Sequence, residues 1–181
     1  MATKKATPSW IDVKAKLADF DRAGLLTLVQ DLYTASKDNR AFLHARLHLG
    51  DDALKPYKAT IDRWLWPDAF KNQDTSVAKA KKAIADYKKA LGDPAGVAEL
   101  MVFYCEQASG FASDVCLDDE GYLGALVRMF GQALDLIETL SPTQRTPLWE
   151  RLRAVHQTCD GIGYGVDEEM DQMLSEHGGH D

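Results

Sequence analysis

The stretch PAGVAELMVFYCEQASGFASDV, from Pro94 to Val115, predicts one long helix of about six turns. At helical spacing its apolar side chains occupy most of the circumference, and Glu99, Glu106 and Ser113 form one narrow polar stripe. A helix that is apolar nearly all round is normally buried by neighbours on several sides. We therefore expect this helix to be central and the rest of the chain to supply the helices that cover it.

Apolar residues recur at helical spacing in the segments on both sides of this helix, and short turn signals separate the segments. Before it, Gly92, Asp93 and Pro94 read as a C-terminal glycine, an N-cap and a first helical residue, which predicts a helical hairpin. After it, Ser141 opens a capping pattern that Pro147 interrupts, so Thr146 is an alternative N-cap. The apolar faces nearest the N-terminus are Trp10, Val13 and Leu17, followed by Leu25, Leu28, Val29, Leu32 and Tyr33.

These patterns predict an all-α fold, since apolar alternation of period two never lasts more than a few residues. We expect about eight helices in antiparallel hairpins, arranged as a short solenoid-like stack or as an irregular bundle. A chain of 181 residues is long enough for one domain with a sizeable core. Residues 8–176 are expected to form that domain, between flexible tails at 1–7 and 177–181.

The composition narrows the classes of protein that need to be considered. Apolar residues make up 45% of the chain, an ordinary value, and the net charge of −7 argues against a general nucleic-acid binder. No apolar run reaches the roughly 18 residues that a membrane span needs, and no secretory signal follows the N-terminal lysines. Three widely spaced cysteines, Cys105, Cys116 and Cys159, suit reduced thiols in a cytoplasmic protein better than a disulfide framework.

Three segments carry a resemblance to a known family. They are DLYTASKDNRAFL at 31–43, AKKAIADYKKALGDPAGVAELM at 80–101 and DDEGYLGAL at 118–126. Together they resemble an uncharacterised family of small all-helical bacterial proteins, a domain of unknown function. The resemblance implies an all-helical fold and a bacterial cytosolic origin, and it assigns no catalytic or binding residue.

The histidine pair His44 and His48 is the first candidate for chemistry. Four residues apart on a predicted helix, the two rings would share one face and provide half of a site for zinc or another divalent metal. A third ligand would have to come from elsewhere in the chain. The alternative is two surface histidines beside Arg40 and Arg46, or one packed and one exposed histidine.

Four weaker patterns each have a structural explanation that we favour. Cys159 continues an apolar stripe, so its spacing from His156 favours a buried thiol over an activated nucleophile. Glu99 and Glu106 could hold metal ions in a bundle, but the Glu-x-x-His partners of such sites are absent from the sequence. The acidic cluster around Asp118 and Asp119 is explained by helix capping, and the GIGYG segment at 161–165 by a helix stop and turn.

Charge and one tryptophan suggest an interaction surface. Lys79, Lys82 and Lys89 belong to the lysine-rich helix predicted over 75–91, and Trp66 should point away from the buried stripe of the helix before it. Beyond Arg153 the chain has acidic residues but no lysine or arginine. This polarity would attract a partner or allow two subunits to pair head to tail as a homo-oligomer. The alternative is that both charged faces are simply solvated.

The sequence therefore favours a non-enzymatic helical module that binds a protein or peptide along a groove lined by Trp66 and the lysine face. One alternative is a metal-dependent enzyme or sensor that uses His44 and His48. A weaker alternative is nucleic-acid binding through the lysine-rich helix, which the overall negative charge disfavours. No cofactor other than this divalent metal is predicted.

Overall fold

The computed structural model describes residues 7–47, 49, 52–68 and 73–178. Within these ranges the chain forms helices and no strands, so the predicted all-α fold is confirmed. The helices are α1 (Trp10–Leu17), α2 (Arg22–Ala35), α3 (Lys37–Arg46), α4 (Lys55–Leu65), α5 (Val77–Ala90), α6 (Pro94–Val115), α7 (Glu120–Glu138), α8 (Pro142–Thr158) and α9 (Val166–His177).

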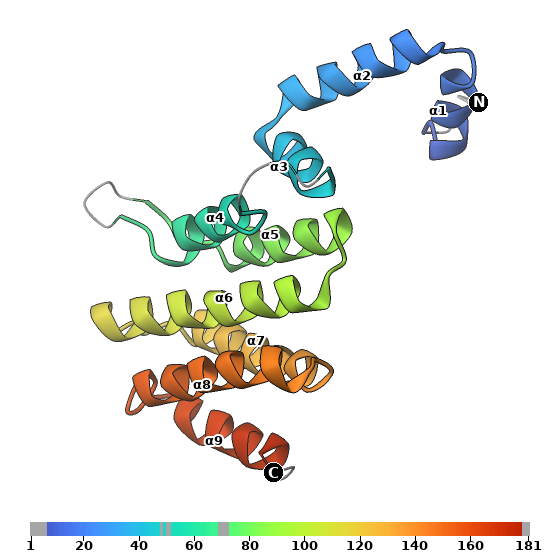
Figure 1. The fold of residues 1–181 in the computed structure, drawn as a ribbon. Coiled ribbons are helices and arrows are strands. Elements are labelled where there is room, and N and C mark those ends of the chain that lie inside the picture. The colour runs from blue at the N-terminus through green and yellow to red at the C-terminus, as the bar shows by residue number, and fades with distance from the viewer. Residues whose placement is uncertain (1–6, 48, 50–51, 69–72, 179–181) are drawn as a thin grey trace, which may run out of the picture.

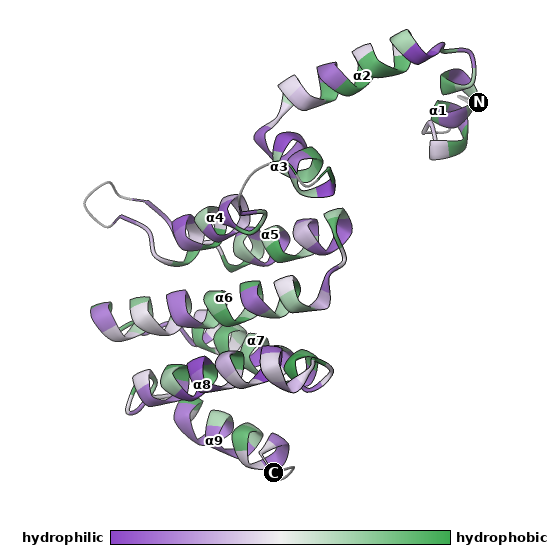
Figure 2. Ribbon diagram, viewed as in Figure 1, coloured by the Kyte–Doolittle hydropathy of each residue, from purple (hydrophilic) through white to green (hydrophobic). Residues whose placement is uncertain are grey.

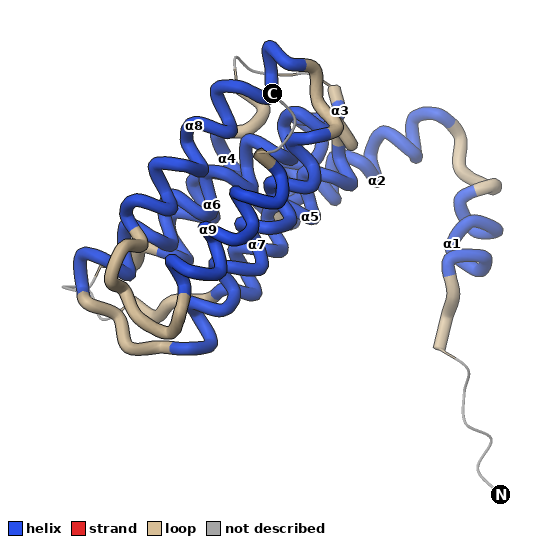
Figure 3. The backbone as a smooth tube through the Cα atoms, turned by 90° about the horizontal axis from the view of Figure 1, so that it is seen from below, coloured by secondary structure: helices blue, strands red, loops and turns tan. Residues whose placement is uncertain are grey.

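Six of these helices form a stack of three hairpins, α4–α5, α6–α7 and α8–α9 (Figure 1). Within the stack α6 contacts both α4 and α8, and α7 contacts α9, so alternate helices also touch. Viewed along the stack, α4, α6 and α8 form one row and α5, α7 and α9 the other (Figure 3). Of the two arrangements that the sequence allowed, the solenoid-like stack is the one observed.

The central helix has the predicted bounds, Pro94 to Val115. The Asp93 side chain accepts a hydrogen bond from the Gly96 amide, and Gly92 adopts a positive φ of 68°, as the predicted hairpin requires. Burial follows the all-round apolar pattern, because Val102 and Leu100 are both fully buried although they lie on different sides of the helix. Helices α4, α5, α7 and α8 supply the cover.

Several predicted helix ends needed correction. Ser36, whose side chain accepts a hydrogen bond from the Asn39 amide, is the N-cap of α3. Helix α8 begins at Pro142 with Ser141 as its N-cap and continues through Pro147. A proline inside a helix removes one backbone hydrogen bond. The burial of the apolar side chains of α8, which are Leu148, Leu152 and Val155, outweighs the free-energy cost of that loss. Helix α9 extends to His177, one residue into the segment 177–181 that was expected to be a flexible tail.

The N-terminal helices depart most from the sequence expectation. No residue of α1 or α2 is buried, and the first buried residue in the described part of the chain is Ala45, near the end of α3. Helix α3 contacts α2 on one side and α5 on the other, so it joins these helices to the stack. Helices α1 and α2 therefore project as an arm and do not help to cover α6 (Figure 1).

Candidate functional site

The apolar side chains of the arm are open to solvent. Apolar and polar residues alternate along α2 (Figure 2), and its apolar residues have the spacing of a core-facing helix. Leu26 is nevertheless 62% exposed and Leu32 is 50% exposed. We call the large apolar side chains that are exposed on and beside α1–α3 the arm surface. Its members are Trp10, Ile11, Val13, Phe20, Leu25, Leu26, Val29, Leu32, Phe42, Leu47 and Leu49. In the rest of the described chain the exposed large apolar residues are Trp66, Val115 and Tyr164, so the arm surface is a distinct patch.

Local hydrogen bonds shape the arm even though nothing covers it. Ser9 and Asp12 form a reciprocal capping box at the start of α1, and the Asp21 side chain caps α2 through the Gly24 amide at 2.7 Å. Between α2 and α3 the Asn39 side-chain amide donates to the Leu32 carbonyl at 2.7 Å. These bonds set the helix ends and the turn. Helices of this length are nevertheless marginal in water when they pack against nothing.

A shallow hollow of about 290 Å³ lies between α2 and α3. Its lining is almost wholly apolar, with Leu26, Val29 and Leu43 among the contributing side chains. At one edge the Tyr33 hydroxyl lies 3.1 Å from Nε2 of His44, and the two rings are tilted at 47°. A hollow of this kind fits a bulky apolar side chain from another helix.

The structure describes only one of the two histidines of the predicted metal site. His44 contacts Tyr33 as described above, whereas His48 lies outside the described residues. Among the residues that the structure describes, no group of three or more histidine, cysteine, aspartate or glutamate side chains is arranged to hold a metal ion. The metal site at His44 and His48 stays a prediction.

Trp66 and the lysine face are placed on different parts of the stack. The Trp66 ring packs edge-on against Phe111 of α6 at 6.5 Å and lies over Gly110, which leaves it 38% exposed. By contrast, Lys79 lies over the ring of Trp64 in α4, with its Nζ 3.5 Å from the centre of the ring.

The lysine face lies beside the base of the arm. Nζ of Lys82 lies 3.3 Å from the carboxylate of Asp38 on α3, and it also pairs with Asp86 on its own helix. At the other end of α5, Arg46 of α3 donates to the Ala90 carbonyl at 3.2 Å, next to the exposed Lys89. The lysine face is therefore a charged border to the arm surface.

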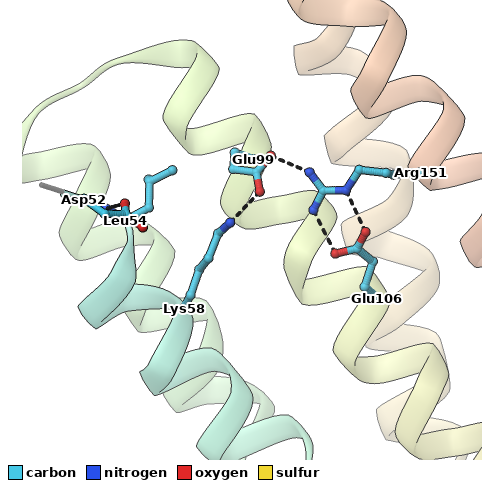
Figure 4. A network of polar contacts seen from close by, with 6 residues as sticks. All are labelled: Asp52, Leu54, Lys58, Glu99, Glu106 and Arg151. Carbon is cyan, nitrogen blue, oxygen red and sulfur yellow. Dashed lines mark hydrogen bonds and ion pairs between the residues drawn. The ribbon is translucent and has the colours of Figure 1, made fainter.

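The polar stripe of α6 is used in an ion-pair network that joins three helices (Figure 4). Arg151 of α8 donates from Nε and Nη2 to the two carboxylate oxygens of Glu106, at 2.7 and 2.8 Å, and from Nη1 to Glu99 at 2.5 Å. Lys58 of α4 donates to the other oxygen of Glu99 at 2.6 Å. The two glutamates thus bind neighbouring helices, which favours a structural role for the stripe.

The network also affects ionisation. Burial raises the pKa of Glu99, but hydrogen bonds and charge from Arg151 and Lys58 outweigh it, so the pKa lies below its ordinary value. Sequence analysis missed Arg151 and Lys58. The seven-residue spacing of the glutamates showed that they share a stripe, but it carried no information about which distant cation would face them.

The cysteine, acidic and glycine-rich patterns have structural roles in the fold. Cys159 is buried, and desolvation raises the pKa of its thiol to about 12, which opposes a thiolate role. Asp119 caps α7 through the Tyr122 amide, and Asp118 accepts a hydrogen bond from the Tyr164 hydroxyl. The glycines of the GIGYG segment all have positive φ, in the turn between α8 and α9.

A polar hollow of about 370 Å³ lies where the ends of α7 and α9 meet the start of α8. Its lining mixes Arg145 and Arg153 with Glu138 and Glu150, around the ring of Trp149. The two signs of charge nearly balance, and Arg153 lies 3.9 Å from Glu150. This hollow therefore has no clear preference for a ligand of one charge.

His177 at this hollow predicts a pH dependence of stability. Burial lowers its pKa, but hydrogen bonds to the Met173 carbonyl and to Asp135, at 2.8 and 3.2 Å, together with the nearby charge of Glu138, raise it above the ordinary 6.5. A raised folded-state pKa gives stability that is fully present below pH 6.5 and is lost as the pH rises through the folded value. We expect urea unfolding of the wild type to show this loss as the pH is raised above 6.5, relative to a His177→Gln variant.

Asp135→Asn is the control, because it removes the charged partner and leaves the imidazole in place. It should reduce the pH-dependent difference without abolishing it, since the Met173 carbonyl still accepts from the ring. Equal slopes for the wild type and His177→Gln would contradict the assignment.

Comparison with known proteins identifies no relative: no protein family, no curated protein and no solved structure matches the chain. None of the helices in the described ranges is long and apolar enough to cross a membrane.

Proposed function

We propose that the protein is a non-enzymatic helical interaction module, and that the arm surface is where it binds an apolar helical face of a protein partner. The observation that supports this most is the exposure of so many large side chains on two helices that bury nothing of their own. Exposed apolar patches of this extent in globular proteins mark interaction sites.

The surroundings of the patch support the same proposal. The hollow lined by Leu26, Val29 and Leu43 would seat an anchoring side chain, and the lysine face supplies a charged border. An apolar centre with a polar border is the usual composition of a protein interface. The three unpaired cysteines support a cytoplasmic setting, and the family resemblance supports a bacterial one.

The residues that the sequence predicted as an interaction surface lie at different distances from the arm surface. Lys82 and Lys89 belong to the border, and Lys79 does so at the end nearer Trp64. Trp66 packs on α6, away from the arm, so it would contact a partner only through the exposed third of its ring. We expect Trp66→Ala to weaken binding less than a substitution at Leu26.

Site-specific photocrosslinking in the source cell tests the proposal. A photoreactive phenylalanine analogue at Leu26 should give a discrete protein adduct, identified by mass spectrometry, because an apolar probe there would lie within the interface. The matched position is Val115, an exposed apolar residue at the end of α6 and outside the arm surface. Adding Val29→Glu to the chain with the probe at Leu26 should remove the adduct. Equal labelling at positions 26 and 115, or an adduct that survives Val29→Glu, would overturn the proposal.

A further inference from the structure

We infer that the partner on the arm surface is a second copy of this chain, so that two arms pack against each other in a symmetric homodimer. The inference rests on the proposed function and names the partner of the same surface. Three observations carry it: the area of the patch, the absence of a receiving patch elsewhere on the described chain, and the charge balance of the arm.

The exposed area matches what a stable dimer needs. The eleven side chains of the arm surface are between 40% and 77% exposed. With about 200 Å² for a large apolar residue, the surface offers on the order of 1,000 Å² from each chain. A standard interface buries about 800 Å² on each partner. Two arms would therefore reach this size without help from the stack if the exposed side chains of α1, α2 and α3 all packed against the second copy.

Self-pairing follows from where the apolar residues are. If the arm docked on the stack of another copy, the stack would need an apolar patch of similar size. Outside the arm the exposed large apolar residues in the described ranges are Trp66 at the end of α4, Val115 at the end of α6 and Tyr164 in the turn before α9, on three separate elements. The surface in this chain that best complements one arm is therefore a second arm.

The charges of the arm allow this pairing. Residues 10–47 contain five aspartates and six lysines and arginines, which is close to neutral, whereas the whole chain carries a net charge of −7. Two arms can meet without net repulsion, and the acidic parts of the two chains stay apart. A symmetric contact also closes on itself, whereas a head-to-tail contact can continue into a filament.

Dimerisation would account for helical structure in the arm. An eight-residue helix and a fourteen-residue helix that bury nothing are marginal alone. Packed in antiparallel fashion against their copies, the apolar faces would form a four-helix contact of the usual kind. The amides of α1 and α2 should therefore be protected from hydrogen exchange at high protein concentration and exchange rapidly on dilution.

Sedimentation velocity and light scattering at about 100 µM protein test the inference. Interfaces of this size have dissociation constants that reach the micromolar range at their weakest, so a dimer should be populated at this concentration. The wild type should have twice the 20.1 kDa mass of one chain. Leu26→Glu combined with Val29→Glu should reduce it to one chain. Both residues are exposed in the single chain and lie outside the stack, so the cooperative thermal unfolding of the stack should not change. Val115→Glu is the control, because it adds the same charge at a valine of similar exposure, 47% against 43% for Val29.

A cysteine scan distinguishes arm-to-arm pairing from other dimers. In a Cys116→Ser background, which removes the exposed native thiol, single cysteines replace Leu25, Leu26, Val29 and Leu32 in turn. In an arm-to-arm dimer whose two-fold axis passes beside α2, the residue nearest the axis lies close to its own copy and should form an intermolecular disulfide, whereas cysteine at Val115 should not.

A wild-type chain that remains monomeric at this concentration would overturn the inference. A dimer that survives the Leu26/Val29 double substitution would also overturn it, and sensitivity of that dimer to salt would point to head-to-tail pairing. The proposed function is judged separately. If the chain is monomeric but still gives a photoadduct at Leu26 with another protein, the proposed function as an interaction module stands. Only the inference that the partner is a second copy is then wrong.

Discussion

Arg151→Met is expected to lower the free energy of unfolding by about 2 kcal/mol at pH 7, measured by urea denaturation. The substitution keeps most of the aliphatic stem and removes the guanidinium that binds Glu99 and Glu106. Losing one partner of a fully buried ion pair costs about 3–5 kcal/mol, and a surface pair is worth about 1 kcal/mol or less. Side-chain exposures of 21–33% place this network between those limits.

Neutralising Glu106 provides the control, because Glu99 keeps its ion pair with Lys58 when Arg151 is replaced. In the double variant Arg151→Met, Glu106→Gln the carboxylate that Arg151 bound through two oxygens is neutral, so we expect it to be more stable than Arg151→Met alone. If Arg151 contributed only through the packing of its stem, the single and double variants would differ little. A loss below about 0.5 kcal/mol in Arg151→Met, the size of an ordinary surface change, would contradict a structural role for the network.

The same network predicts the response to acid. Because the folded-state pKa of Glu99 is depressed, its contribution is present above the unfolded value near 4.5 and is lost as the pH falls through the folded value. The wild type should therefore lose stability below pH 4.5 more steeply than Arg151→Met does. This comparison separates the ionic contribution of Arg151 from its packing, since packing does not titrate.

The network also shows which features of the site helical periodicity can and cannot predict. The spacing of Glu99 and Glu106 places both on one stripe of α6, which the structure confirms. Their partner Arg151 is 45 residues from Glu106 along the chain and reaches it only because the α8–α9 hairpin stacks on α6–α7. Helical periodicity describes one element at a time, so it identifies a polar stripe but not the side chain that faces it.

The two ends of the chain illustrate the same limit. Helix α6 was predicted with its correct bounds because Asp93 and Pro94 mark its start locally and its sides are nearly all apolar. Helix α2 has an equally clear apolar face, yet that face is open, because periodicity shows which side of a helix is apolar and not what covers it. Pro147 is the converse case, in which a local stop signal is overridden by tertiary packing of Leu148 and Leu152.

Gly96→Ala is expected to destabilise the protein by about 3 kcal/mol, although alanine is the better helix former by about 1 kcal/mol. A Cβ at this position would lie 2.0 Å from the hydroxyl oxygen and 2.6 Å from Cζ of Tyr87 on α5. Tyr87 is 3% exposed and packs edge-on against the buried ring of Tyr57 at 5.3 Å. Relief of this overlap requires that the buried ring shift against Tyr57 or that α5 and α6 separate. Overpacking of this kind costs about 1–3 kcal/mol or more.

Gly124→Ala is the matched control, a substitution of the same type inside α7. There the nearest atom to a new Cβ is Nη1 of Arg128 at 3.3 Å, the end of a flexible and exposed side chain. We expect this variant to gain roughly 0.5–1 kcal/mol from helix propensity and the reduced freedom of the unfolded chain. Thermal and urea unfolding should therefore shift in opposite directions for the two variants.

Shortening Tyr87 tests the cause of the Gly96 effect. In a Tyr87→Leu background the ring that opposes the new Cβ is absent, so Gly96→Ala should cost at least about 1 kcal/mol less than in the wild type, the scale of coupling between residues in contact. If alanine were equally harmful in both backgrounds, the damage would lie in the first turn of α6, where the Gly96 amide donates to Asp93 at 2.9 Å. A coupling energy near zero would therefore rule out the close approach of α5 and α6 at Gly96 as the reason that this position requires glycine.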